Sequence, residues 1–171
     1  DCVWNRNTPP SMTPERLAAM RRAGFRVLGF GVESFSPAIL QEFNKSAIYQ
    51  HIDTNLAEAL RVGVVPFLDL ILASPRCSIE DVSHSVRQAF RWVQAGCEVG
   101  IYPYVIPFSG AAMSSDPSLE PHTIYADRQV QGSSVTWRQP EKILPIDPIV
   151  RKTISAAETC FEQQLEALSS I

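Results

Sequence analysis

The stretch Gly29-Phe30-Gly31-Val32-Glu33-Ser34-Phe35-Ser36-Pro37 decides how this chain is interpreted. Residues 25–32 are a short, mostly apolar run, which is typical of a strand buried on both faces in a parallel sheet. The run ends on the carboxylate of Glu33, and Ser36 and Pro37 then supply a cap and a first position for a helix. The pattern predicts a buried strand that ends on an acidic side chain and turns into a helix.

The segments on either side of this stretch alternate between helix and strand. A capped helix over residues 13–24 precedes it, and a longer amphipathic helix over 49–62 follows it. Residues 64–72 and 99–106 are continuous apolar runs of strand length, separated by a helix over 78–95. Strands and helices joined by short connections imply right-handed crossovers and a parallel sheet. We therefore predict an α/β fold with parallel strands and outer helices, as in part of a (β/α) TIM-type barrel.

The ends of the chain lack this alternation. Residues 1–12 and 111–122 are expected to be loops. The predicted division places half of a barrel in residues 1–113 and an extension in residues 114–171.

The extension is predicted to be a hairpin followed by a helix. Residues 123–130 and 134–138 flank a Gln-Gly-Ser turn and favour an antiparallel pair of strands. Residues 140–148 are expected to be a stiff linker, and the final amphipathic helix is expected to reach about residue 168.

Composition excludes several classes of partner. The chain has 171 residues, 45% of them hydrophobic and 19% charged, with a formal net charge of −3, which argues against a nucleic-acid footprint or a polybasic membrane surface. No apolar run approaches the ~20 residues of a membrane helix, and no signal-peptide pattern is present. We expect a cytoplasmic protein and, for the longer protein that would contain it, a small-molecule substrate. Because Asp1 is not Met, the sequence is expected to begin inside a longer gene product or after processing.

The four cysteines do not form a metal-binding motif. Cys2, Cys77, Cys97 and Cys160 are far apart, and neither C-x-x-C nor C-x-x-x-C-x-x-C occurs. We expect no metal site in this chain, and we expect thiols in a reducing compartment.

Three polar side chains lie at or near the predicted carboxyl ends of the strands, where ligands bind in sheets and barrels of this class. Glu33 ends one strand, Lys45 follows the next short helix, and Asp69 lies inside an apolar strand. The carboxylates are candidates to accept hydrogen bonds from ligand hydroxyls, and Lys45 to meet a ligand carboxylate. Alternatively, Glu33 caps a helix, Asp69 pairs with a neighbour, and Lys45 is solvated.

These residues lie in motifs that resemble the radical S-adenosylmethionine (radical SAM) superfamily, near its cobalamin-associated and oxygen-independent coproporphyrinogen oxidase-like branches. RVLGFGVESF at residues 26–35, with the Asn-Lys pair at 44–45, is similar to the family's fourth strand. FLDLI at 67–71 resembles the fifth strand, and PFSG at 107–110 resembles the turn after the sixth. The resemblance covers about residues 13–113.

The resemblance implies contacts to S-adenosylmethionine. Glu33 would hydrogen-bond the ribose hydroxyls, Asp69 would be a second ribose contact, and Lys45 would meet the methionine carboxylate. The backbone that would flank the adenine is that of Ile106, Pro107 and Phe108.

The chain departs from the family pattern in two respects. Residues 73–77 read ASPRC where the family has a glycine-rich turn, and the three-cysteine loop that holds its [4Fe–4S] cluster is not among these residues. The resemblance therefore implies a fragment of an iron–sulfur oxidoreductase or transferase that uses a 5′-deoxyadenosyl radical. Alone, the fragment is expected to be catalytically inert, because the cofactor carries that chemistry.

Two other functions are open at this point. A half-barrel leaves unpaired strand edges, so the chain is alternatively a non-catalytic interaction module that self-associates through exposed sheet edges and its final helix. It is otherwise an unrelated barrel enzyme that uses Glu33 and Asp69 as an acid–base pair.

Overall fold

The structure, a computed structural model, describes residues 12–107, 111–129, 134, 136–156 and 159, together with the backbone of residues 2–5. The described part divides into two compact units, Asp1–Leu72 with Glu80–Tyr102, and Ala73–Ile79 with Pro103–Ile171. The expected boundary at residue 113 stays a prediction.

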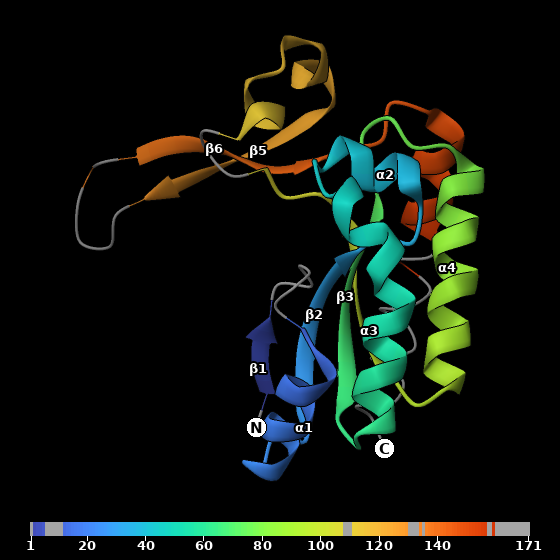
Figure 1. The fold of residues 1–171 in the computed structure, drawn as a ribbon. Coiled ribbons are helices and arrows are strands. Elements are labelled where there is room, and N and C mark those ends of the chain that lie inside the picture. Colours follow the sequence, from blue (N-terminus) through green and yellow to red (C-terminus); the bar gives the residue numbers. More distant parts are fainter. Residues whose placement is uncertain are drawn as a thin grey trace, which may run out of the picture. The chain divides into compact units, whose positions relative to one another are not determined.

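The α/β fold is confirmed by a four-stranded sheet of order β1-β2-β3-β4 (Figure 1). Its strands are β1 (Cys2–Asn5), β2 (Val27–Glu33), β3 (Val65–Ala73) and β4 (Glu98–Tyr104). The β1–β2 and β2–β3 pairs are parallel, with Trp4 opposite Gly29 and Gly29 opposite Phe67. The expectation of a loop at the start of the chain was wrong for β1, which has too few residues to show a pattern of its own.

Helices connect the strands of the sheet. They are α1 (Pro14–Arg22), α2 (Pro37–Glu42), the 3₁₀ helix η1 (Ser46–Ile48), α3 (Tyr49–Arg61) and α4 (Ile79–Gln94). The two predicted caps are confirmed, since the side chains of Thr13 and Ser36 accept hydrogen bonds from the N–H groups of Arg16 and Ile39.

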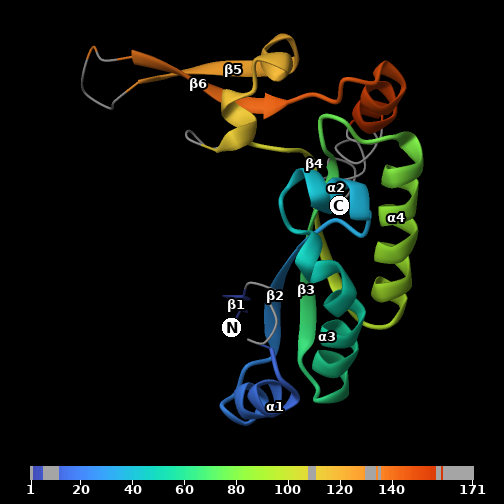
Figure 2. The ribbon, with the colours of Figure 1, turned by 45° about the horizontal axis from the view of Figure 1, so that its top comes forward.

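The core of the first unit lies between the helices and one face of the sheet. Figures 1 and 2 show α3 and α4 on the same side of β2 and β3. The strands contribute buried side chains at alternate positions, and the helices cover them with Leu17, Leu56 and Trp92 among others. The core positions of β2 and β3 are Leu28, Phe30, Val32, Leu68 and Leu70.

Not every apolar residue of α4 faces this core. Val82, Ser85, Ala89 and Trp92 are buried, whereas Phe90 is 65% exposed.

The second unit contains the predicted hairpin, formed by β5 (Thr123–Gln129) and β6 (Thr136–Ile143) (Figure 2). The linker expected from residue 140 was wrong for Pro140–Ile143, because β6 continues through Pro140 opposite a register shift between Ile124 and Tyr125. A proline is tolerated in a strand at such an irregularity.

Short helices complete the second unit. The loop expected over residues 111–122 instead contains the 3₁₀ helices η2 (Ala112–Ser115) and η3 (Pro117–His122). The final helix begins at residue 148, and its predicted part beyond 159 lies outside the described residues. The buried side chains include Leu119, Ile143, Val150 and Ile154.

Candidate functional site

Glu33 lies at the end of β2, in a backbone conformation that is unusual for its residue type. Its φ is +62°, and the register between β2 and β3 shifts between Phe30 and Glu33, which places Glu33 opposite Leu70. Left-handed backbone at a residue other than glycine, asparagine or aspartate is uncommon and costs free energy. The turn at the end of β2 therefore gives the Glu33 side chain a direction that an ordinary strand would not.

The end of helix α2 positions Lys45. The Asn44 N–H donates to the Gln41 carbonyl at 3.0 Å, and the Lys45 N–H donates to the Leu40 carbonyl at 2.7 Å. With Asn44 at φ +55°, these bonds form a Schellman motif, which fixes the backbone that follows the helix. From there, the Lys45 ammonium donates to Glu33 Oε1. The side chain of Glu33 is 19% exposed and that of Lys45 is 41% exposed, so the ion pair is partly open to solvent.

Asp69 is buried in the middle of β3 and has no hydrogen-bond partner within the described part of the chain for either carboxylate oxygen. The residue is 5% exposed. Burial, and secondarily the nearby charge of Glu33, raise the pKa of the Asp69 carboxyl above its ordinary value. An unpaired buried carboxylate is costly, and a ligand that donates hydrogen bonds would remove that cost.

Glycines lie beside these carboxylates. A Cβ added at Gly31 would come within 3.1 Å of Glu33 Oε1 and 3.9 Å of Lys45 Nζ. A Cβ added at Gly100 of β4 would lie 2.9 Å from Phe67 Cζ and 3.6 Å from Asp69 Oδ1. The absence of side chains at these two positions leaves room for the ion pair and for Phe67 beside Asp69.

Three of the predicted site residues thus belong to the first unit: Glu33 and Asp69 lie on the neighbouring strands β2 and β3, and Lys45 follows α2. The alternative that Asp69 pairs with a neighbour finds no partner in the described ranges. Ser36, rather than Glu33, caps α2, and Lys45 is paired rather than simply solvated. Their roles toward a ligand, including an acid–base role for Glu33 and Asp69, stay predictions.

The predicted adenine-flanking residues do not belong to the first unit. Ile106 and Pro107 belong to the second unit, where Ile106 is 57% exposed, and Phe108 lies outside the described residues.

Sequence reasoning missed a group of buried hydroxyls next to Glu33. Ser34 and Ser85 are 0% and 1% exposed, and their Oγ atoms lie 2.7 Å apart. The available signal was Ser85 itself, a polar residue in an otherwise apolar stripe of α4. Asp81, in the first turn of α4, accepts a hydrogen bond from the Ser36 hydroxyl.

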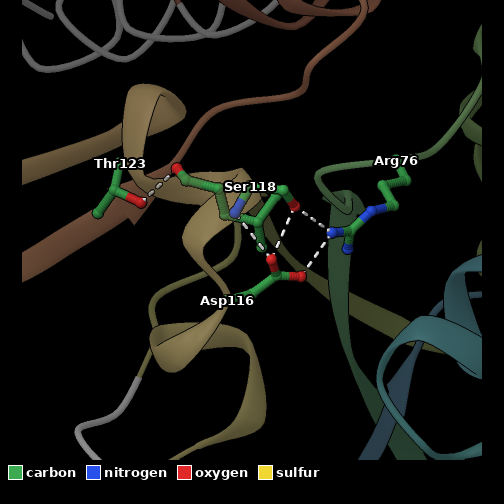
Figure 3. A network of polar contacts seen from close by, with 5 residues as sticks. Arg76, Asp116, Ser118 and Thr123 are labelled. Carbon is green, nitrogen blue, oxygen red and sulfur yellow. Dashed lines mark hydrogen bonds and ion pairs between the residues drawn. The ribbon is translucent and has the colours of Figure 1, made fainter.

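Residues 73–77 stand where the family has a glycine-rich turn. Arg76 of this segment makes polar contacts within the second unit (Figure 3). Arg76 Nη2 donates to Asp116 Oδ2 at 2.6 Å and to Ser118 Oγ at 2.8 Å. Hydrogen bonds from Ser118, and then from Arg76, lower the pKa of the Asp116 carboxyl. Arg76 therefore links residues 73–77 to η3 and its cap within the second unit.

A cavity of about 290 Å³ lies on the helical side of the first unit. Its charged groups contact each other, because Asp53 accepts hydrogen bonds from Arg91 at 2.6 Å and from the Trp92 indole at 3.0 Å. It is lined by Phe35, Tyr49, Gln50, Ile52, Asp53, His84, Gln88 and Arg91.

The described residues include no group of three or more His, Cys, Asp or Glu side chains that could hold a metal. Burial raises the pKa of the Cys97 thiol to about 11, which disfavours the thiolate that metals bind. Within the described residues, the buried Cys77 and Cys97 thus form no site that fits an iron–sulfur cluster. In the described ranges, each helix is too short or too polar to cross a bilayer.

One solved structure with a similar fold is that of coproporphyrinogen III oxidase (HemN) from Escherichia coli, described as a radical SAM enzyme. The match has 18% sequence identity and a TM-score of 0.49, and it covers 61% of this chain and 24% of that one. No family model matches the chain, and no curated protein matches it. Similarity this weak carries no argument about function, which must rest on the residues of the chain.

Proposed function

We propose that this chain forms part of the S-adenosylmethionine site of a radical SAM enzyme. In this proposal, Glu33 and Asp69 accept hydrogen bonds from the ribose hydroxyls, and Lys45 meets the methionine carboxylate. The backbone around Ile106, Pro107 and Phe108 flanks the adenine. The motif resemblance suggests these roles. For Glu33, Lys45 and Asp69, their contacts and burial in the structure also support the proposal.

The observation that carries the proposal is the Asp69 carboxylate, which is buried and has no partner in the described part of the chain. Hydroxyl donors from a ribose would satisfy it, since hydrogen bonds to a charged acceptor are roughly twice as strong as neutral ones. Gly31 supports the same interpretation, because a Cβ there would crowd the Glu33 carboxylate, and Gly100 leaves room for the Phe67 ring beside Asp69.

Lys45 supports the second half of the proposal. The Lys45 side chain is 41% exposed while its ammonium donates to Glu33, so the side chain is accessible to a second anionic group. An ammonium can donate three hydrogen bonds, and it could therefore bridge Glu33 and a ligand carboxylate.

Bound S-adenosylmethionine would supply a 5′-deoxyadenosyl radical that abstracts hydrogen from a substrate, once a [4Fe–4S] cluster delivers an electron. The described cysteines do not fit that cluster, and the sequence has no C-x-x-x-C-x-x-C motif, so we assign this chain no step in electron transfer. The chain's own contribution would be to bind and orient the ribose and the carboxylate.

The test is an NMR titration of the 171-residue chain with S-adenosylmethionine. We expect Glu33→Gln and Asp69→Asn each to weaken binding about tenfold or more, as loss of a charged hydrogen bond implies. Asp53→Asn, which changes a carboxylate on α3 that already has two partners, is the matched control and should leave binding unchanged.

A second ligand separates the role of Lys45. Lys45→Met should weaken binding of S-adenosylmethionine but not of 5′-methylthioadenosine, which has a ribose and no carboxylate. If the wild-type chain binds neither compound, or if all variants bind equally, the proposal is wrong.

The interaction module is a second candidate, favoured by exposed apolar side chains in the first unit. Phe90 and Val93 of α4 are 65% and 45% exposed, and Ile101 and Tyr102 of β4 are 55% and 46% exposed. Concentration-dependent association in analytical ultracentrifugation, reduced by Ile101→Lys and accompanied by no nucleoside binding, would support this candidate instead.

A further inference from the structure

The backbone at Glu33 forms a γ-turn of the rare type. The Ser34 N–H donates to the Val32 carbonyl at 2.7 Å, a bond between residues two apart, and the central residue has φ +62°. The positive-φ form of this turn is strained, and such strain persists only where the surrounding structure over-determines the conformation. Some other part of the fold must therefore hold the turn in place.

Helix α4 supplies the first set of contacts, through Ser85. Its Oγ lies 2.7 Å from Ser34 Oγ and accepts a hydrogen bond from the Phe35 N–H at 3.2 Å. Ser34 Oγ in turn accepts from the Ser36 N–H at 3.0 Å. Ser34 and Phe35 are thus both hydrogen-bonded to the side chain of Ser85, which lies 51 residues after Ser34 in the sequence.

A second contact comes from the same face of α4. The Ser36 hydroxyl donates to Asp81 Oδ1 at 2.6 Å, and it also accepts from the Ile39 N–H at 3.4 Å as the cap of α2. Asp81 and Ser85 are four residues apart, so they lie one above the other on the helix. Together they bind both ends of the segment from Ser34 to Ser36.

We propose that Ser85 and Asp81 are positioning residues, which hold Glu33 in its γ-turn and so direct its carboxylate toward the ligand. This inference rests on the proposed function for the identity of the ligand, but not for the conformation of the turn. The buried neighbours of Ser85 on α4 include Val82, Ala89 and Trp92, so an apolar side chain would satisfy the core equally well. The hydroxyl is explained by its contacts to the turn.

The experiment compares Ser85→Ala with Ala89→Gly in the free 171-residue chain. The second variant weakens the same helix one turn further on and leaves every hydroxyl in place. A positive φ gives a strong NOE between a residue's own amide proton and α proton, so this NOE at Glu33 reports the turn directly. Binding of S-adenosylmethionine is measured on the same samples.

We expect Ser85→Ala to weaken the Glu33 NOE, to shift the Phe35 amide resonance, and to reduce affinity about tenfold. Ala89→Gly should do none of these, and Ser85→Thr, which keeps a hydroxyl, should restore the NOE. If Ser85→Ala does not fold, Ser34→Ala takes its place. It removes the contacts of the Ser34 hydroxyl to Ser85 and to the Ser36 N–H but leaves the Phe35 bond, and it should also weaken the Glu33 NOE.

Two results would overturn the inference. One is a Glu33 NOE that is unchanged in Ser85→Ala, and the other is an equal loss of NOE or affinity in Ala89→Gly. Absence of ligand binding by the wild-type chain would contradict the proposed function alone, and the NOE would then decide whether Ser85 holds the turn.

Discussion

Glu33 at the end of β2 and Asp69 in the middle of β3 are both acidic, but their surroundings differ. Glu33 is paired with Lys45 and partly exposed, but its backbone has φ +62°. Asp69 lies in regular strand backbone, but its carboxylate is buried without a partner in the described part of the chain. One acid costs free energy through its main chain and the other through its desolvated side chain.

This difference indicates two separate contributions to one site. Strain at Glu33 fixes a direction, and it is offset by contacts that exist without a ligand. The cost at Asp69 is not offset in the described ranges, so binding of a donor would relieve it. Substitutions should separate the two contributions, because one arises in the backbone of Glu33 and the other in the side chain of Asp69.

The largest effect is expected at Asp69. Replacing it with leucine removes a buried unpaired carboxylate from an apolar strand and should increase the free energy of unfolding by about 1–3 kcal/mol at pH 7. Urea unfolding measures this gain. Asp53→Leu is the control, because it breaks contacts to Arg91 and Trp92 and should give no gain.

The difference in stability between Asp69→Leu and the wild-type chain should depend on pH. Because folding raises the pKa of Asp69, its unfavourable contribution is absent below the ordinary aspartate pKa and grows as the pH rises through the raised value. The advantage of Asp69→Leu should therefore shrink as the pH falls. A constant difference between the two proteins from pH 3 to pH 7 would contradict the raised pKa.

An intermediate effect is expected from the backbone at Glu33. Glu33→Ala and Glu33→Gly both delete the carboxylate, but only glycine adopts φ +62° freely, so the glycine variant should be the more stable by about 1 kcal/mol. Thermal unfolding measures the difference. The same two substitutions at Glu58, inside α3, should give the opposite order, because glycine destabilises a helix interior.

The smallest effect is expected from the ion pair. Lys45→Met keeps an apolar stem and removes the charge, and the partly exposed pair should contribute less than about 1 kcal/mol. Chemical unfolding at 0.1 M and 1 M salt should show the loss shrinking at high salt. A loss above about 2 kcal/mol, independent of salt, would mean that the pair is far less solvated than its exposure indicates.

The regular elements of the first unit were predictable because local residues determine them. Thr13 and Ser36 cap helices, and glycines at 24, 63 and 96 have positive φ after α1, α3 and α4. Asn44 takes that role after α2, which is the less frequent choice. Short elements such as β1, and the extent of β6 beyond Pro140, depend on pairing with distant strands and left no local pattern.

The candidate site was predictable only in its outline. The apolar runs predicted that Glu33 ends a strand and that Asp69 lies inside one, but the contact between Ser34 and Ser85 joins residues 51 apart. No spacing rule links these two positions, because the contact exists only after α4 packs on the sheet. The γ-turn is equally hidden, since glutamate is not a residue that signals positive φ.

In β2 and β3, residues that belong to the core have even numbers, and residues of the candidate site have odd numbers. Even positions from Leu28 to Val32, and Leu68 and Leu70, belong to the buried core. Odd positions include Gly31, Glu33, Phe67 and Asp69, the residues of the candidate site. A saturation scan should therefore alternate along each strand: substitutions at the even core positions should change stability, and those at the odd positions should also change what the folded protein binds.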